Sequence, residues 1–202
     1  QWLTLALYPI VIVCQQVTRI FRHGEKTSIL SRGDVRQVVS LGYRDGLIRE
    51  HEKDIIENLM SKEHLLTREI MTPKERLVCL NEDSSITALN RKSKAWHVSR
   101  IPIYSGDPNS ITGYVLKDEV LAERVSGAKN KKLSTLVREI LVIKPETKLI
   151  DLYNQMVSAD EHIAVVNDGN DVVGIITMED VLEEILGQEI VDESDQARGV
   201  LD

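Results

Sequence analysis

The sequence predicts an α/β fold in which one strand–helix–strand–strand–helix unit occurs twice between residues 68 and 190. Four matches within this stretch carry this prediction. A helix start at Ile86 matches one at Leu149, and two longer stretches recur about sixty residues later, 100–104 (RIPIY) as 163–167 (IAVVN) and 113–121 (GYVLKDEVL) as 174–182 (GIITMEDVL). A shorter stretch, REIM at 68–71, also returns as REIL at 138–141. Such duplication indicates two copies of one supersecondary unit.

The second copy shows its elements most clearly. Leu141–Ile143 is a short β-branched strand, and the apolar spacing from Leu149 to Met156 is typical of a helix. Two apolar strands follow, separated by a cluster of Asn, Asp and Gly that indicates a tight turn. A last helix is predicted to begin near Thr177 and to end at Gly187, which suits the left-handed position after a helix.

The junction between the last strand and the last helix is the candidate site. Unpaired N–H groups make a helix start electropositive, so it suits phosphate or another anion. Thr177 and Asp180 stand there at i and i+3. That spacing fits a capping box, and it equally fits a hydroxyl and a carboxylate that meet a ligand. Both interpretations stay open at this point.

The remaining chain divides by composition. Residues 1–25 contain a charge-free apolar run of thirteen residues, shorter than the ~20 that span a bilayer, followed by basic residues, so we expect the end of a membrane or interfacial segment. The alternative is a buried helix of a soluble domain. Residues 26–67 form an expected acidic helical linker, with Asp34 capping one helix and a second helix from about Arg49 to Ser61. The expected domains are 68–130 and 131–190, with an acidic tail at 191–202.

Composition excludes several classes of function. The chain has 25 Lys and Arg against 32 Asp and Glu, a net charge of −7, which argues against a nucleic-acid partner. Its two cysteines build neither a metal site nor a disulfide framework. Its five histidines are scattered, and no catalytic motif is present, so we expect no enzyme activity.

Several of these motifs resemble one family. GIITMED at 174–180 resembles the strand–helix junction of tandem CBS (cystathionine-β-synthase-type) modules. IMTP at 70–73, SRIPIY at 99–104, EHIAVV at 161–166 and the acidic stretch GLIREHE at 46–52 are similar to the CorC/cyclin-M family of magnesium and cobalt efflux proteins. The resemblance covers about residues 30–190. It implies a tandem CBS-domain pair behind a helical linker, on the cytoplasmic side of a membrane protein.

The resemblance also implies a ligand and partners. It implies an adenine nucleotide, ATP with Mg²⁺, between the CBS repeats, with magnesium held by phosphates and by no protein ligand. It implies a homodimer that controls a magnesium-transporting membrane domain outside this chain. In this resemblance Asp180 would bind the ribose, Thr177 and Arg100 would bind the phosphates, and Ile101 and Pro102 would contact the adenine. As alternatives, Arg100 forms an ion pair with a protein carboxylate, and Ile101 and Pro102 belong to the core. The expected nucleotide-binding residues are Thr72, Ser99, Arg100, Ile101, Pro102, Thr177 and Asp180.

The first copy departs from the pattern. Leu116 stands where Thr or Ser is expected and Glu119 where Asp is expected. Leucine cannot donate a hydrogen bond to phosphate, so we expect one nucleotide per chain. Two other functions compete with this one: a nucleotide-independent dimerisation scaffold of a membrane protein, and a soluble nucleotide hydrolase.

Overall fold

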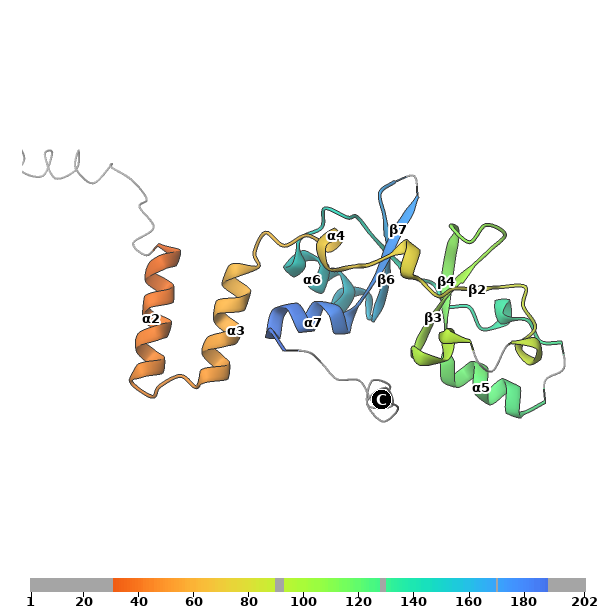
Figure 1. Ribbon diagram of the computed structural model, residues 1–202, viewed down its shortest axis with the longest axis horizontal. Coiled ribbons are helices and arrows are strands. Elements are labelled where there is room, and N and C mark those ends of the chain that lie inside the picture. Colours follow the sequence, from red (N-terminus) through yellow and green to blue (C-terminus); the bar gives the residue numbers. More distant parts are fainter. Residues whose placement is uncertain (1–30, 90–92, 128–129, 170, 189–202) are drawn as a thin grey trace, which may run out of the picture. The chain divides into compact units, whose positions relative to one another are not determined.

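The computed structural model describes residues 31–89, 93–127, 130–169 and 171–188. The predicted membrane or interfacial segment at 1–25 and the acidic tail at 191–202 lie outside these ranges. The chain divides into two compact units, one that ends at Ile48 and one that begins at Arg49 (Figure 1). We find no bilayer-spanning helix among the described residues.

The first unit contains helix α2 (Arg32–Arg44). Its N-cap is Ser31, whose hydroxyl accepts the Asp34 N–H at 3.2 Å, while the Asp34 carboxylate accepts the Ser31 N–H at 2.6 Å. The prediction that Asp34 is the N-cap is therefore wrong by three residues. Ser31 is the N-cap, and Asp34 is the acidic residue at position N3 of the same capping box.

The second unit begins with the linker helix α3 (Glu50–Ser61), as predicted, followed by the short helix α4 (Thr67–Ile70). The Glu52 carboxylate accepts the N–H of Arg49 at 2.8 Å and so satisfies one donor at the start of α3. None of the α3 residues is buried, and the helix packs against α7 (Met178–Leu186) near the end of the described chain.

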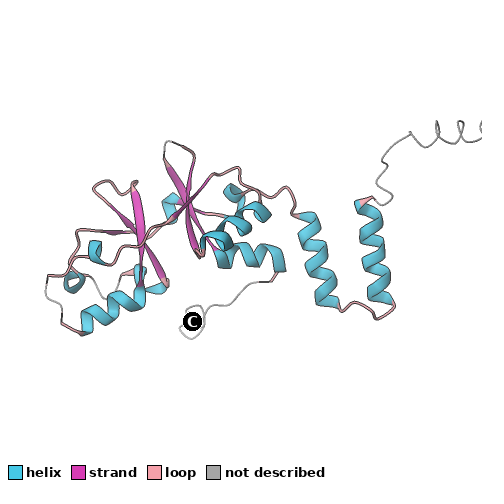
Figure 2. Cartoon of the chain, turned by 180° about the vertical axis from the view of Figure 1, so that it is seen from behind, coloured by secondary structure: helices cyan, strands magenta, loops and turns pink. Residues whose placement is uncertain are grey.

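The second repeat forms a four-stranded sheet covered by two helices (Figures 1 and 2). Its strand order is β1 (Thr72–Pro73), β7 (Val172–Thr177), β6 (Ile163–Asn167) and β5 (Leu141–Ile143). Helices α6 (Leu149–Ala159) and α7 pack on it and on each other. The core between them is aliphatic and almost fully buried: Ile143, Leu149, Leu152, Met156, Ala164, Val166, Ile176 and Val181.

The first repeat forms a three-stranded sheet in the order β2 (Leu80–Asn81), β3 (Arg100–Tyr104) and β4 (Ile111–Leu116), followed by helix α5 (Lys117–Val125). The helix start predicted at Ile86 is only a 3₁₀ turn, η2 (Ile86–Ala88). The Ile86 N–H bonds to the Lys131 carbonyl at 2.9 Å, and the Ser84 carbonyl accepts from Leu133 at 3.0 Å. Backbone groups here thus pair with a distant segment instead of along a helix. Another 3₁₀ turn, η3 (Lys94–His97), follows.

The segments that open the two repeats cross over to each other's sheets. Thr72 and Pro73 pair with Ile175 and Gly174 of β7, so β1 is the edge strand of the second sheet. In the same way Arg138 forms a bridge with Tyr114 of β4, with N···O distances of 2.8 and 3.1 Å. The predicted boundary at residue 68 therefore gives the first domain a strand that the structure places in the second sheet.

Glycine makes each crossing possible. A Cβ atom added to Gly113 would lie 2.2 Å from the Arg138 carbonyl oxygen, and one added to Gly174 would lie 2.5 Å from the Thr72 carbonyl oxygen. Real Cβ atoms do not approach backbone oxygens so closely. The glycine that opens each copy of the GYVLKDE and GIITMED pattern is thus needed for backbone packing.

Candidate functional site

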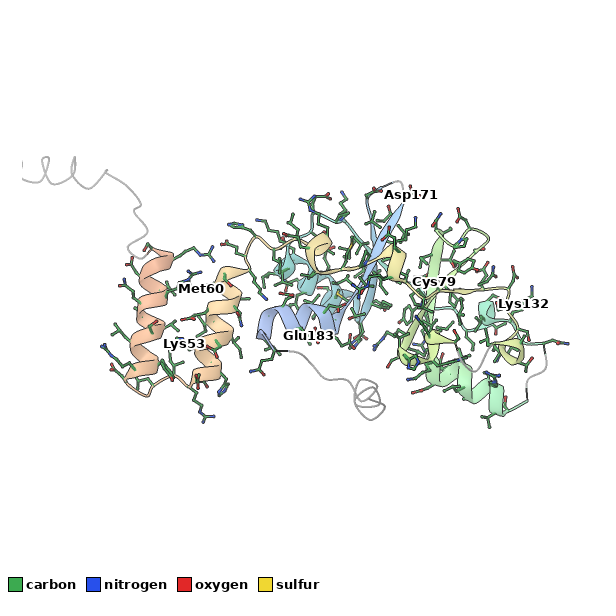
Figure 3. All side chains as sticks on the ribbon, in the orientation of Figure 1. Lys53, Met60, Cys79, Lys132, Asp171 and Glu183 are labelled. Carbon is green, nitrogen blue, oxygen red and sulfur yellow. The ribbon has the colours of Figure 1, made fainter. Side chains whose placement is uncertain are left out.

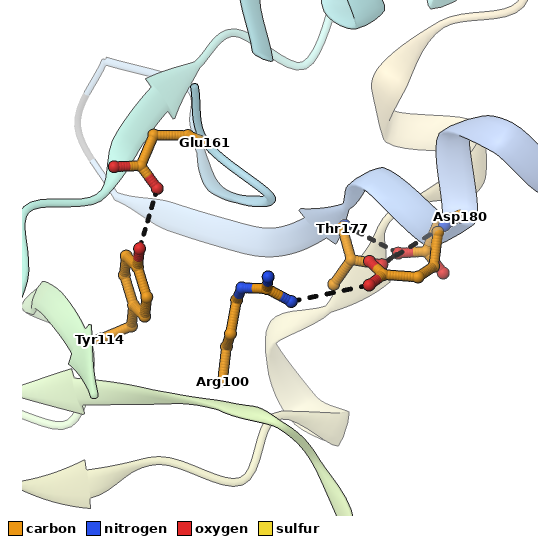
Figure 4. Close-up of polar contacts among 6 residues, drawn as sticks. Arg100, Tyr114, Glu161, Thr177 and Asp180 are labelled. Atoms are coloured by element: carbon orange, nitrogen blue, oxygen red, sulfur yellow. Dashed lines mark hydrogen bonds and ion pairs between the residues drawn. The ribbon is translucent and has the colours of Figure 1, made fainter. Parts of the chain in front are cut away.

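The candidate site lies where β7 meets α7. Thr177 is the N-cap of α7, and its hydroxyl donates to Asp180 Oδ2 at 2.7 Å. The Thr177 N–H donates to the same oxygen at 2.8 Å, and the Asp180 N–H donates back to Thr177 Oγ1 at 3.3 Å (Figure 4). The capping box that the spacing allowed is therefore formed. A carboxylate offers about four acceptor positions, so Asp180 keeps capacity for further donors.

Arg100 brings the first repeat to this junction. Its Nη1 lies 3.6 Å from Glu179 Oε1 in the first turn of α7, and the two side chains are 25% and 49% exposed (Figure 4). The ion pair that the sequence left open as an alternative is thus present. Partly exposed pairs of this kind contribute little stability, about 0–1 kcal/mol. The guanidinium is consequently able to exchange Glu179 for another oxyanion at small cost.

The other predicted residues fall into two groups. Thr72 faces Ile175 in the register of β1 and β7, and Ser99 is exposed directly before β3. Pro102 is buried and shares the sheet face of Arg100, because alternate residues of a strand face the same side. Ile101 faces the opposite side and is fully buried in the core of the first repeat. The prediction that its side chain forms an apolar wall is corrected here, since that side chain packs inside the module.

Tyr114 was missed by sequence reasoning. It is 6% exposed, and its hydroxyl donates to Glu161 Oε2 at 3.0 Å, which joins β4 of the first repeat to the loop between α6 and β6 of the second (Figure 4). The available signal was the repeat itself, because a tyrosine stands where the second copy has Ile175. A side chain with a hydroxyl, at a position where the other copy has an apolar residue, indicates a hydrogen-bond partner in the other repeat.

This contact predicts a pH dependence. Burial, and then the hydrogen bond to Glu161, raise the pKa of Tyr114 above its ordinary value of 10.0. The unfolded chain therefore loses this proton first, so the contribution of Tyr114 to stability is complete below about pH 10 and is lost as the pH rises through the folded pKa. We expect the unfolding free energy of Tyr114→Phe to fall less steeply above pH 10 than that of the wild type, measured by denaturant titration. Identical slopes would contradict the assignment.

The equivalent junction of the first repeat is built differently. Leu116 is the N-cap of α5 and makes no side-chain hydrogen bond to the helix. Glu119, at the position of Asp180, accepts from Arg138 Nη2 at 2.6 Å. The hydroxyl is thus missing, and the carboxylate is already paired with a cation from the crossing segment. The two junctions are therefore chemically unequal.

Two surface hollows lie away from both junctions. One runs along α6 and is lined by Leu141, Asn154, Gln155, Ser158 and Ala159. The other lies beside α5 and is lined by Trp96, Leu121, Arg124 and Val125. Among the described residues, no group of three or more His, Cys, Asp and Glu side chains is arranged to hold a metal ion.

Comparison with known proteins agrees with this architecture. The model of the CBS domain family matches residues 133–187. A CBS domain of a bacterial CNNM/CorC family Mg²⁺ transporter has a TM-score of 0.70 at 24% identity, over 81% of this chain and all of that one. A structure of such a CBS domain in complex with ATP has a TM-score of 0.60 at 24% identity, over 68% of this chain and 98% of that one.

A UPF0053 protein from Synechocystis is 28% identical over 197 residues, which are 97% of this chain and 57% of that protein. The chain thus spans about half the length of this curated relative. Together these findings confirm the α/β CBS fold, which the chain shares with CBS domains of CNNM/CorC family Mg²⁺ transporters.

Proposed function

We propose, on the premise that this chain carries a CBS domain and shares the fold of CBS domains from CNNM/CorC family Mg²⁺ transporters, that it is the regulatory module of such a transporter. In this proposal it lies on the cytoplasmic side of the membrane and binds Mg-ATP at the junction of β7 and α7. The observation that carries the proposal is the convergence of Thr177, Asp180 and Arg100, from two repeats, on the start of one helix.

The side chains suit the parts of a nucleotide. Asp180 has acceptor capacity for ribose hydroxyls, and the start of α7 with the Thr177 hydroxyl offers donors to phosphate. Arg100 presents a forked cation that matches phosphate oxygens, once it leaves Glu179. In the proposal Thr72 and Ser99 border this surface, and Pro102, which is buried on the Arg100 face of β3, presents only an edge of its ring to the base. Magnesium would arrive with the phosphates, since it prefers phosphate oxygens and water to a cage of protein ligands.

Regulation requires that the nucleotide prefers one conformation. A ligand shifts an equilibrium only by its difference in affinity for the two states. Arg100 supplies such a difference, because it links the two repeats to each other in the absence of ligand and would link them through the phosphates when ligand is bound. We propose that this change reaches a membrane domain through the linker. In this proposal the chain binds the nucleotide and does not release phosphate from it continuously.

The test is calorimetric titration of the chain with Mg-ATP up to about millimolar concentration, where a free energy of binding of about −4 kcal/mol is still detected. We expect saturable heat with one site per chain, because Leu116 has no hydroxyl to donate to phosphate at the first junction. Two equal sites would contradict that asymmetry. If titration with Mg-ATP gives no heat of binding, the nucleotide-independent scaffold is the remaining function. Steady phosphate release in the same samples would indicate a hydrolase.

Dimerisation is part of the proposal and supports the scaffold alternative as well. Leu121 and Val125 on α5 are 40% and 88% exposed, and Val157 on α6 is 52% exposed, next to the two hollows. Leu121 and Val125 are four residues apart and share one face of α5, so in the proposal a second chain covers that face. Light scattering of the calorimetry samples should give the mass of two chains. A mass of one chain with full Mg-ATP binding would separate nucleotide binding from assembly.

A further inference from the structure

Helix α7 contacts a different part of the chain at each end. Its first turn holds Asp180 and the Glu179–Arg100 ion pair. At its last turn, Asn58 Nδ2 of α3 donates to the Leu186 carbonyl at 3.4 Å, and Lys62, directly after α3, forms an ion pair with the Glu184 carboxylate. Figure 3 labels Met60 and Glu183 on the two helices. One helix of nine residues therefore joins the candidate site to the linker.

The contact at the last turn is close. Gly187 ends α7 with a φ of 70°, and a Cβ atom added there would lie 1.9 Å from Asn58 Nδ2. The last carbonyls of a helix have no partner within the helix, so the Asn58 amide satisfies a group that α7 leaves open. The side of α3 thus rests directly on the end of α7.

The segment after α3 is fixed to the second repeat by backbone bonds. The Thr67 N–H and hydroxyl both donate to the Thr147 carbonyl, at 2.9 and 2.8 Å, and the Leu149 N–H donates to the Leu65 carbonyl at 2.9 Å. Thr67 is fully buried, whereas no residue of α3 is. A helix fixed beyond one end and resting sideways on α7 takes its orientation from that sideways contact.

We infer that α7 couples the β7–α7 junction to the linker helix α3, so that events at the first turn change how firmly α3 is held at the last. Glu179 and Leu186 are seven residues apart, about 10 Å along the axis, and a helix this short moves nearly as one body. The Lys62 and Glu184 side chains are 29% and 32% exposed. Their contact is weak enough that a modest push at the first turn alters its occupancy. The inference rests on the proposed function only where it names Mg-ATP as the natural ligand.

Hydrogen exchange of the α3 amides in the full chain tests the contact itself. Lys62→Glu and Glu184→Lys should each speed exchange in α3 by about two- to fivefold, and the double variant should return it to within about twofold of the wild type. Lys132→Glu is the matched control, because it breaks another ion pair, with Asp83, and should leave α3 unchanged. A double variant as fast as the single ones would overturn the inference.

The coupling is tested without nucleotide by Asp180→Ala, which should speed exchange in α3 as well as in α7, whereas Asp151→Ala at the start of α6 should not. Faster exchange in α7 with α3 unaffected would overturn the inference. With Mg-ATP at concentrations that saturate both proteins, exchange in α3 should change in the wild type but not in Lys62→Glu. If Mg-ATP fails to bind the wild type, the proposed function falls, and the nucleotide-free comparison still decides the coupling.

Discussion

Replacing Gly174 with alanine should lower the free energy of unfolding by about 3 kcal/mol, at the upper end of what overpacking usually costs. The new Cβ would lie 2.5 Å from the Thr72 carbonyl oxygen and 2.8 Å from Met71 Sδ. The methionine side chain is able to move away, but the carbonyl belongs to β1, whose register with β7 is fixed. The chain must therefore separate β1 from β7 or shift both. The midpoint temperature of thermal unfolding should drop by roughly 6–12 °C for a chain of this size.

Gly113→Ala should behave in the same way, because its Cβ would meet the Arg138 carbonyl at 2.2 Å. Gly33→Ala is the matched control: it lies in α2, its nearest neighbour would be Ser31 Oγ at 3.5 Å, and alanine favours a helix. Denaturant and thermal unfolding of the three variants check the prediction. Wild-type stability in Gly174→Ala would mean that β1 does not cross to β7 in solution.

Asp180→Ala should weaken Mg-ATP binding by at least about tenfold. Hydrogen bonds to a charged group contribute about 1.5–3 kcal/mol each, and 1.4 kcal/mol is a tenfold change in affinity. Asp180→Asn should fall between alanine and the wild type, because the amide keeps an oxygen acceptor and loses the charge. Calorimetric titration of the three proteins side by side measures this series.

The loss of the capping box must be separated from the loss of a ligand contact, because Asp180→Ala removes both. Asp34→Ala provides the control, since Asp34 has the same place in the capping box of α2, in the other unit. Both variants should lose a similar amount of helix stability, about 1 kcal/mol. Only Asp180→Ala should lose affinity. Equal affinities for Asp180→Ala and the wild type would mean that Asp180 is a cap alone.

Local patterns were sufficient to predict the second repeat. Neighbours in the sequence decide three of its features: the end of the last helix at Gly187, the capping box of Thr177 with Asp180, and the turn after β6. The duplication then predicted that two such units occur. The helix expected at Ile86 failed because its backbone groups pair with Lys131 and Leu133, far along the chain.

The parts of the candidate site that the sequence did not specify are long-range contacts: Tyr114 was missed, and the ion pair of Arg100 was an alternative with no named partner. The Tyr114–Glu161 bond spans 47 residues, and the Arg100–Glu179 pair joins different repeats. Neither has a sequence spacing that could indicate it. Ile101 was left open between an adenine wall and the core, and the structure places it in the core, because Arg100 and Pro102 share one face of β3 and Ile101 lies on the other.

The exchange of opening segments between the sheets governs how this protein is dissected. A fragment cut between the copies at about residue 130 would take β1 away from the second sheet and the Arg138 bridge away from the first. Each half would then present unpaired backbone groups along an open edge, a surface that invites association with other chains. The smallest piece that keeps both crossings is the interlocked pair, so each copy that was duplicated in the sequence lacks part of its own sheet pairing when it is cut out alone.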